Sequence, residues 1–582
     1  MEHPPPAAPA ATLARECAAD AVAAFERYNA EFRAITRRAP LRFEERDWRS
    51  SQRDAVERIE LYGGYVERTV AGLRLRLADE SLDRALWTTI KQEFARLIEP
   101  LADAEFRKTF FNSLTRTFFG TIGVSPEIEF VALDLDPLAR VAEYDFMASY
   151  ANRGSLQLVL EEVLSGFRCK APWRDFERTV GTVTAAVERH LAESGERLSV
   201  ERVEMIRPAF FQMTRAYLVG RLAGHDWHLP LVIALKNTER GVLVDAVMTR
   251  DSDVSILFSF TRSYFHVDLE RVGKAVLFLK QLMPHKPVSE LFTVIGRAKQ
   301  GKTERYRELF RHLQTATDQF VPAPGERGLV MVVFTLPSFD VVFKLIRDRF
   351  PAQKNIVRAD VLRKYEFVFK HDRAGRLVDA QEFKRLRFPR RLFDPVLLTE
   401  LRAEAAGTVH EDGDDLIIDH CYIERRMTPL NLYVRAVGAE DAEQAVFEYG
   451  QAIRDLAHTN IFAGDLLLKN FGVTRNRRVI FYDYDELGLV TDCRFRELPP
   501  AQSDEDELRG ETWYYVADND VFPETFINFL GFDAHLRQAF IAAHGEVLTA
   551  QWWRGVQERL RANDVLEVLP YTARRVRVAS SV

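Results

Sequence analysis

Three polar residues in one short segment have the types and the spacing that phosphoryl transfer requires. In HTNIFAGDLLLKNFGVTRNRRVIFYDYDE (458–486), Asp465 precedes Asn470 by five residues, and Asp483 follows Asn470 by 13. This is the spacing of a kinase catalytic loop, Asp-x-x-x-x-Asn, and of the aspartate that ends the next hairpin. Asp465 would orient the attacking hydroxyl, and the oxygens of Asn470 and Asp483 would hold Mg²⁺ or Mn²⁺ against nucleotide phosphates.

Two lysines could supply positive charge to the same reaction. Lys469 lies just before Asn470, where it could neutralise the moving phosphoryl group. Lys344 lies about 120 residues upstream of the catalytic loop, in the β-type run VVFKLI that follows a glycine-containing loop. A lysine among apolar strand residues is costly to bury without a partner, and a kinase uses such a lysine to hold the α- and β-phosphates.

The segment departs from the ordinary protein-kinase pattern in several places. The loop APGERGL (323–329) stands where a kinase has G-x-G-x-x-G, and Ala463-Gly464 replaces the usual His-Arg. Tyr484-Asp485 replaces Phe-Gly, and the sequence has no A-P-E element. By themselves the three polar residues could also be incidental, because Asp and Asn are common in turns. We therefore expect a kinase-like site that is not an ordinary eukaryotic-type protein kinase.

The elements around these residues predict a two-lobed α+β domain. Runs of β type are expected at 329–335, 339–346, 365–378 and 415–427. The third run contains a predicted turn at 372–375. A helix is expected over 439–460, with Glu448 on its surface, and a strand over 477–485. An order in which strands come first and helices second is typical of an α+β fold.

The preceding part of the chain has a mainly helical pattern. Apolar residues recur three and four apart at 18–35 and 53–77, and a hairpin is predicted within 231–249. The stretch FVPAPGERG (320–328) marks a boundary by its prolines and glycines. The expected fold is α+β, with an N-terminal mainly helical regulatory domain over 1–320 and a C-terminal bilobal kinase-like domain over 321–582.

Composition limits the function classes. The net charge of −6 excludes a bulk polycation, and 47% apolar residues exclude wholesale disorder. The four cysteines are far apart with no CxxC, so neither a disulfide scaffold nor a thiolate zinc site is expected. The start MEHPPPAAPAATLARE suggests a flexible leader, and the most apolar stretch (328–346) is interrupted by Pro337, Asp340 and Lys344. We expect a soluble cytoplasmic protein with no membrane partner.

Two other segments suggest different ligands. GRAKQGKT (296–303) satisfies the P-loop pattern, with ELFTVI as a strand before it and Lys302 on the phosphates. The residues between its two glycines are mostly bulky and favour a helix. No Walker B aspartate follows, so a basic turn or helix is the alternative. The stretch 363–391 has ten Lys/Arg against four Asp/Glu. We interpret it as solvated surface, ahead of docking of an acidic partner, and nucleic acid is not expected.

Several stretches resemble the bacterial isocitrate dehydrogenase kinase/phosphatase family over nearly the whole chain. They are SILFSFTRSYFHVD (255–268), APGERGL, VVFKLIRDRF (341–350), DRAGRLVDAQEF (372–383), HCYIERRMTPLN (420–431) and 460–486. The resemblance implies a bifunctional enzyme that phosphorylates a serine of NADP-dependent isocitrate dehydrogenase and also removes that phosphate. This reaction switches carbon flow between the Krebs cycle and the glyoxylate bypass. ATP and ADP are the implied nucleotides, AMP is the implied allosteric effector, and a homodimer is allowed.

The resemblance also assigns roles to residues. The implied nucleotide contacts are Ala323, Pro324, Gly325, Glu326, Arg327, Gly328, Leu329, Lys344 and the hinge from Glu424 to Met427. The implied catalytic residues are Asp379, Asp465 and Lys469, and the implied metal ligands are Asn470 and Asp483, with Asp485 beside them. The sequence has neither a Cys-x5-Arg loop nor a two-metal His/Asp cluster, so we expect both activities to share one nucleotide site.

Two alternatives to a protein kinase stay open from the residues. The loop from Gly464 to Asn470 is similar to the Gly-Asp-x4-Asn loop of aminoglycoside-type phosphotransferases, which act on small molecules. The large N-terminal domain favours a protein substrate instead. A nucleotide-sensing scaffold is disfavoured, because all four residues that transfer would need are present, namely Lys344, Asp465, Asn470 and Asp483.

Overall fold

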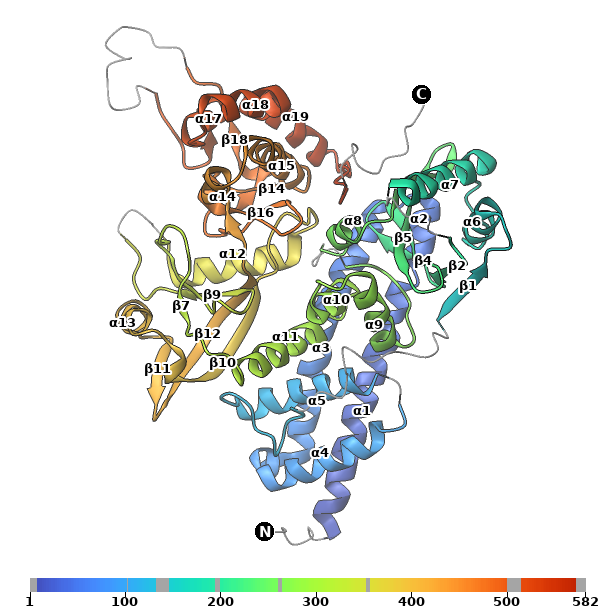
Figure 1. Ribbon diagram of the computed structural model, residues 1–582. Helices are drawn as coiled ribbons and strands as arrows, with labels where there is room; N and C mark the ends of the chain where they lie inside the picture. The colour runs from blue at the N-terminus through green and yellow to red at the C-terminus, as the bar shows by residue number, and fades with distance from the viewer. Residues whose placement is uncertain are drawn as a thin grey trace. The chain divides into compact units, whose positions relative to one another are not determined.

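The chain forms two compact units (Figure 1). The computed structural model describes residues 8–101, 103–131, 146–193, 199–259, 264–351, 356–499 and 514–571. One unit comprises Met1–Thr315 together with Pro570–Val582, and the other comprises Ala316–Leu569.

The first unit begins with helices that pack around an aromatic core. They are α1 (Ala8–Thr36), α2 (Ala39–Glu45), α3 (Trp48–Leu77), η1 (Ala78–Leu82), α4 (Arg84–Ile98) and α5 (Ala104–Phe119). Phe25 on α1 meets Phe106 on α5 edge to face, with ring centroids 5.4 Å apart. Helix α1 begins inside the segment expected to be a flexible leader, so that expectation is wrong from Ala8 on, because Ala14 and Cys17 are buried in this core. Residues 1–7 lie outside the described part of the chain.

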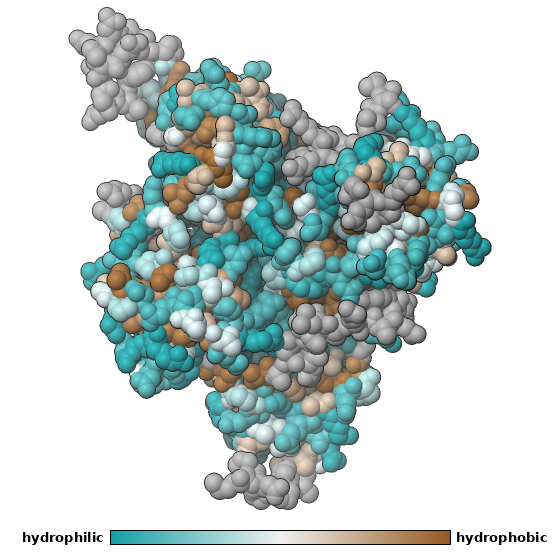
Figure 2. All heavy atoms as spheres, viewed as in Figure 1, coloured by the Kyte–Doolittle hydropathy of each residue, from teal (hydrophilic) through white to brown (hydrophobic). Residues whose placement is uncertain are grey.

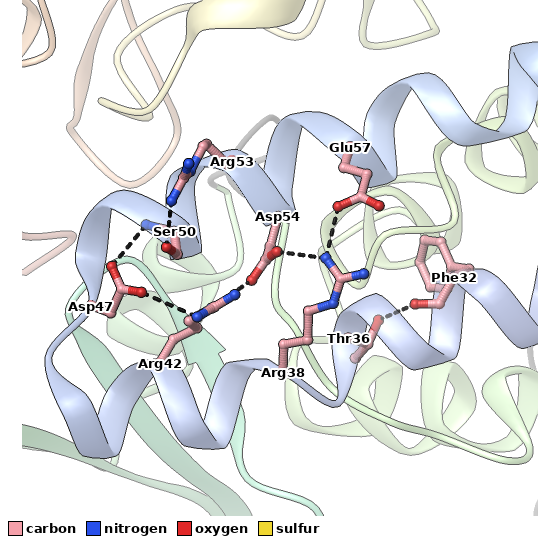
Figure 3. Close-up of polar contacts among 9 residues, drawn as sticks. All are labelled: Phe32, Thr36, Arg38, Arg42, Asp47, Ser50, Arg53, Asp54 and Glu57. Carbon is pink, nitrogen blue, oxygen red and sulfur yellow. Dashed lines mark hydrogen bonds and ion pairs between the residues drawn. The ribbon is translucent and has the colours of Figure 1, made fainter.

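Charged side chains fix the corner between α1, α2 and α3 (Figure 3). Arg38 and Arg42 both donate to the buried carboxylate of Asp54, at 2.9 and 3.0 Å. Asp47 caps the start of α3 by accepting a hydrogen bond from the backbone N–H of Ser50 at 3.1 Å. These contacts determine where α3 begins.

A six-stranded antiparallel sheet follows within the same unit. Its elements are β1 (Met147–Ala151), α6 (Leu156–Ser165), α7 (Phe176–Glu193), β2 (Arg202–Ile206), β3 (Phe210–Gln212), β4 (Arg215–Ala223), β5 (His228–Thr238) and β6 (Gly241–Met248). The strand order is β1-β2-β4-β5-β6, with β3 beside β4. The predicted hairpin is confirmed as β5 and β6, and Gly241 supplies the φ of 108° that the turn needs. The sequence did not predict the other strands.

Helices follow this sheet, and the last two of them occupy the region proposed as a P-loop. These are α8 (Asp251–Leu257), α9 (Val272–Leu282), α10 (Val288–Val294) and α11 (Ala298–Leu313). The strand expected before GRAKQGKT is therefore wrong, because that segment lies largely in α10. Gly301 lies inside α11, where an added Cβ would be 2.1 Å from the Thr293 hydroxyl oxygen. This glycine permits close helix packing and does not shape a phosphate loop, so the P-loop alternative is wrong.

The second unit begins with a sheet-containing lobe. Its elements are β7 (Val321–Pro322), β8 (Met331–Thr335), β9 (Val341–Ile346), α12 (Arg358–His371), β10 (Gln381–Pro389), η2 (Arg390–Leu392), α13 (Pro395–Glu404), β11 (Val409–Asp412) and β12 (Asp415–Arg425). The strand order is β10-β12-β9-β8-β7, with β11 beside β12. The strands expected at 329–335, 339–346 and 415–427 are confirmed.

Helix α12 corrects the β run expected at 365–378. Val361, Tyr365 and Val368 lie four and three residues apart, and all three are buried on one face of the helix. Packing of this face outweighs the strand propensity of the aromatic and valine residues. The turn after the run is confirmed, because the Asp372 carboxylate accepts hydrogen bonds from the N–H groups of Ala374 and Gly375.

The rest of the second unit is mostly helical. Its main elements are β13 (Thr428–Pro429), α14 (Leu430–Ala436), α15 (Ala439–His458), β14 (Ile461–Phe462), η3 (Leu468–Asn470), β15 (Phe471–Val473), β16 (Val479–Phe481) and β17 (Gly488–Leu489). It ends with η4 (Val490–Asp492), β18 (Arg494–Phe495), β19 (Asp520–Val521), η5 (Pro523–Thr525), α17 (Phe526–Phe529), α18 (Ala534–His544), η6 (Gly545–Leu548) and α19 (Ala550–Arg561). The α+β plan with a two-lobed C-terminal part is confirmed.

The described residues show no sign of a membrane-crossing helix. Within the ranges given above, no helix combines the length and the apolar composition that a span needs. On the face drawn in Figure 2, hydrophilic residues cover most of the surface, and apolar residues form separate patches. All four cysteines lie in the described ranges, and none of them is in a disulfide.

Candidate active site

A cavity of about 360 Å³ in the second unit contains most of the residues singled out in the sequence. It is lined by Ala323, Pro324, Gly325, Glu326, Arg327, Gly328, Leu329, Lys344, Glu424, Met427, Asp465, Lys469, Asn470 and Asp483. Residues that the sequence did not single out also line it, among them Arg347, Glu400, Asn431 and Tyr482. The volume lies within the range of small-molecule sites. Residues more than 100 positions apart in the chain therefore share one concave site.

Lys344 projects from β9 into this cavity and is held by a buried ion pair. Its ammonium lies 2.8 Å from the carboxylate of Glu424 on β12 and donates to the Tyr482 carbonyl at 2.6 Å. Glu424 is only 1% exposed. In the antiparallel register Glu424 lies opposite Val342, two residues from Lys344, so both side chains emerge on the same face of the sheet. The lysine expected to need a partner has one.

This partner differs from the one that protein kinases use. In those enzymes the lysine pairs with a glutamate from the helix that follows its strand. Here the helix in that position, α12, presents Tyr365, whose ring stacks on Tyr422 at 3.8 Å. Burial, and next the Glu424 charge, raise the pKa of Tyr365 well above its usual value, so this hydroxyl stays protonated. Sequence reasoning assigned Glu424 to the hinge and missed its ion pair, because only the strand register reveals it.

The loop that carries Asp465 is fixed by hydrogen bonds. The Asp465 carboxylate accepts from the Leu467 N–H at 2.9 Å, and its carbonyl accepts from the Asn470 side chain at 3.4 Å. Tyr449 on α15 donates to the Leu466 carbonyl at 2.6 Å. The loop therefore presents Asp465 and Asn470 to the cavity in a defined arrangement.

A close backbone approach explains the glycine before Asp465. Gly464 has a φ of 76°, and an added Cβ would lie 2.4 Å from the Glu486 carbonyl oxygen. Any larger residue would push the two segments apart. The glycine therefore allows Asp465 and Asp485, which follow and precede these contacts, to line the same cavity.

The hairpin of β15 and β16 brings the two predicted metal ligands together. Phe471 pairs with Phe481 across the hairpin, and the Tyr482 N–H donates to the Asn470 carbonyl at 3.0 Å. Asn470 comes directly before β15, and Asp483 comes shortly after β16. Both residues therefore lie at the same end of the hairpin. Among the described residues no group of three or more His, Cys, Asp or Glu is arranged to hold a metal alone. Oxygen donors in this number fit Mg²⁺, which usually takes one or two carboxylates together with phosphates and water.

Lys469 contacts the loop that covers the cavity. Its ammonium lies 3.1 Å from the Glu326 carboxylate, and both side chains are substantially exposed, at 40% and 62%. The contact joins the loop 323–329 to the segment that carries Asp465.

Asp379 is the one predicted catalytic residue that does not line this cavity. It is 9% exposed, and its carboxylate accepts from the Gln381 side chain at 2.9 Å. The Val378 N–H donates to the Phe481 carbonyl, which places the neighbouring backbone beside the strand that leads to Asp483. A catalytic role for Asp379 stays a prediction of the family resemblance.

A buried charged cluster behind the cavity corrects the interpretation of Glu448. Arg376 is 1% exposed and donates to the carboxylates of Asp455 at 2.7 Å and Glu448 at 2.8 Å, and to the Val479 carbonyl at 3.0 Å. Burial alone would lower the pKa of Arg376, but the two carboxylates outweigh it and raise that pKa. Glu448 is therefore a buried ion-pair partner, and the expectation of a surface residue is wrong. The cluster ties α15, β16 and the segment before Asp379 together.

Arg376→Met should lower the free energy of unfolding of the chain by about 3 kcal/mol, because it removes the arginine that forms ion pairs with two buried carboxylates. Urea denaturation measures the change. The matched control is Arg477→Met, which removes an exposed arginine that pairs with Asp441 and should cost less than about 1 kcal/mol. Equal losses in both variants would contradict the assignment of Glu448 to the buried cluster.

The basic stretch 363–391 finds much of its counter-charge within the chain. Arg387 pairs with Asp412 and Asp415, and Arg390 pairs with Glu411. These carboxylates come from the hairpin of β11 and β12, outside the stretch in sequence. The pairs support the interpretation as solvated surface for Arg387 and Arg390, but that interpretation is wrong for Arg376, which is buried.

The comparisons with known proteins identify the family. The domain described as isocitrate dehydrogenase kinase/phosphatase (AceK), regulatory domain, matches residues 18–317, and the corresponding kinase domain matches residues 318–573. The chain belongs to the isocitrate dehydrogenase kinase/phosphatase family.

Relatives of that name match the chain almost from end to end. The isocitrate dehydrogenase kinase/phosphatase of Anaeromyxobacter sp. (strain Fw109-5) is 47% identical over 554 residues, 95% of this chain and 96% of the relative. That of Xanthomonas euvesicatoria pv. vesicatoria (strain 85-10) is 47% identical over 577 residues, 99% of this chain and 100% of the relative. That of Xanthomonas campestris pv. campestris (strain 8004) is 48% identical over 550 residues, covering 94% and 95%. The family resemblance seen in the sequence is confirmed.

Proposed function

We propose that the chain is an ATP-dependent protein serine kinase and phosphatase that acts on NADP-dependent isocitrate dehydrogenase. The observation that supports this most directly is the cavity in which Lys344, Asp465, Asn470 and Asp483 all take part. Membership of the isocitrate dehydrogenase kinase/phosphatase family supports the substrate. By inactivating and reactivating the dehydrogenase, the enzyme would control flux between the Krebs cycle and the glyoxylate bypass.

In the kinase direction each residue has one task. Lys344 holds the α- and β-phosphates, and the loop 323–329 covers them while the hinge from Glu424 to Met427 meets adenine. Asp465 accepts a hydrogen bond from the substrate serine and takes its proton as the new P–O bond forms. Lys469 lies beside the transferring group and stabilises its charge.

Asn470 and Asp483 would hold the divalent metal, Mg²⁺ or Mn²⁺. When bound, this ion neutralises phosphate charge and orients the β- and γ-phosphates. The amide oxygen of Asn470 and the carboxylate of Asp483 are hard donors that suit either ion. Asp485 lines the same cavity.

In the phosphatase direction the same residues would work in reverse. The phosphoryl group of phosphoserine passes to ADP, which regenerates the serine hydroxyl and ATP, and water then cleaves ATP to ADP and inorganic phosphate. The proton that Asp465 takes up in the forward direction returns to the serine oxygen. One site therefore serves both activities.

Other features implied by the family resemblance stay predictions. These are AMP as an allosteric effector, the cytoplasmic location and a homodimer. The assignment of domains to 1–320 and 321–582 is likewise our proposal for where regulation and catalysis divide.

One experiment tests the function. The chain is incubated with purified isocitrate dehydrogenase, Mg²⁺ and ATP labelled in the γ-phosphoryl group, and both serine labelling and dehydrogenase activity are followed. We expect label on a serine with loss of dehydrogenase activity, and recovery of activity when ADP is supplied and free ATP is removed. Transfer only to an aminoglycoside-like small molecule, or nucleotide binding with no transfer, would contradict the proposal.

A further inference from the structure

The loop over the cavity brings the Glu326 carboxylate into contact with Lys469, the lysine that we expect to meet the transferring phosphoryl group. Residues 324–329 of this loop are all exposed. Gly325 has a φ of 116°, a conformation suited to glycine, and the next residue, Glu326, contacts the Lys469 ammonium at 3.1 Å. The two side chains come from opposite lobes of the second unit, 143 residues apart in sequence.

ATP carries a third phosphate that ADP lacks, and we expect this phosphate to meet Lys469, the residue that Glu326 contacts. A terminal phosphoryl group on Lys469 would bring a second anion to the ammonium that Glu326 already contacts. Two anions at one ammonium repel each other, so the Glu326 carboxylate competes with the third phosphate for Lys469 and weakens its binding there. ADP lacks this phosphate, and its binding leaves the contact between Glu326 and Lys469 intact.

We propose that Glu326 sets the nucleotide preference of the site, favouring the diphosphate over the triphosphate by competing with the terminal phosphoryl group for Lys469. The inference rests on the proposed function, because it takes Lys469 as the residue that meets that group. Glu326 is a specificity-determining residue in this account and takes no part in bond making. With ADP bound, its contact with Lys469 holds the loop across the cavity.

This preference bears on the direction of the reaction. Return of a phosphoryl group from phosphoserine requires ADP to stay bound until the phosphoprotein docks. A loop held to Lys469 by Glu326 slows the departure of ADP. Both directions pass through the same transition state, so the transferring phosphoryl group displaces Glu326 from Lys469 in either direction. The carboxylate therefore favours the phosphatase direction only by keeping ADP bound until the phosphoprotein docks.

Calorimetric titration of the full chain with the Mg²⁺ complexes of ADP and of β,γ-imido-ATP tests the proposal. Glu326→Gln should shift the ratio of the two dissociation constants toward the triphosphate analogue by about two- to fivefold, the range that an exposed ion pair supplies. The shift should shrink at high salt, because the charges involved are exposed. Release of ADP should also be faster in this variant.

A matched control is Glu497→Gln. Glu497 forms an exposed ion pair with Arg554 at 2.8 Å, with exposed fractions of 65% and 48%, close to those of Glu326 and Lys469. This variant should keep the wild-type ratio. If wild type binds both nucleotides and Glu326→Gln leaves their ratio unchanged, the inference about Glu326 is overturned and the proposed function stands. If wild type binds neither nucleotide, the proposed function itself fails.

Discussion

Asp465→Asn should reduce phosphoryl transfer to isocitrate dehydrogenase by about 10²- to 10⁴-fold, the contribution of a positioned general base. The amide has nearly the shape of the carboxylate, and its oxygen can still accept from the Leu467 N–H, so the loop should keep its conformation. Nucleotide binding should change little, because Lys344 and the loop 323–329 are untouched. Labelled transfer at saturating ATP measures the loss, and titration with Mg²⁺·ADP checks that binding persists.

The phosphatase activity of this variant tests the shared site. If the phosphoryl group returns to ADP through the same arrangement, phosphatase turnover should fall by a similar factor, because the same carboxylate returns the proton. Asp441→Asn is the control: Asp441 pairs with the exposed Arg477 and should leave both activities at wild-type levels. Retention of kinase activity by Asp465→Asn would remove Asp465 from its proposed role.

The arrangement of Asp465, Asn470 and Asp483 could be anticipated because it is local. Four loop residues separate Asp465 from Asn470, and one short hairpin leads from there to Asp483, so spacing alone determines their proximity. Lys344 could be anticipated for a different reason, since a lysine in an apolar strand needs a partner. Its partner Glu424 could not be identified, because a shift of one residue in the pairing of β9 and β12 would turn one of the two side chains to the other face of the sheet.

Errors arose where distant packing overrides local preference. The run around Tyr365 favours a strand by composition, but it forms α12 because one face of the helix is buried. Glu448 has the pattern of an exposed helix residue, and only the buried Arg376, 72 residues earlier, explains its burial. Gly301 matches the P-loop pattern by chance, and its role in the structure is to let α11 approach α10 closely. For Tyr365 and Glu448 the deciding neighbours are distant in the chain, whereas for Gly301 the neighbour is Thr293, on the segment predicted as a strand that forms α10 instead.

Lys344→Met should have two separable effects, on stability and on activity. The substitution leaves the Glu424 carboxylate buried without its ammonium, which should cost about 3–5 kcal/mol in free energy of unfolding. The double variant Lys344→Met/Glu424→Gln removes the buried charge as well and should recover much of that loss. Both variants should lack kinase activity, because neither has an ammonium for the α- and β-phosphates.

Comparison of the two variants distinguishes a catalytic lysine from a structural one. If Lys344 served only to neutralise Glu424, the more stable double variant would regain activity along with stability. Because Lys344 lines the cavity and also donates to the carbonyl of Tyr482, the residue before Asp483, we expect stability to return and activity to stay absent. Phosphatase activity should disappear together with kinase activity in both variants. A Lys344→Met protein with full phosphatase activity and no kinase activity would refute the shared nucleotide site, since removal of the phosphate would then proceed without the group that holds ADP.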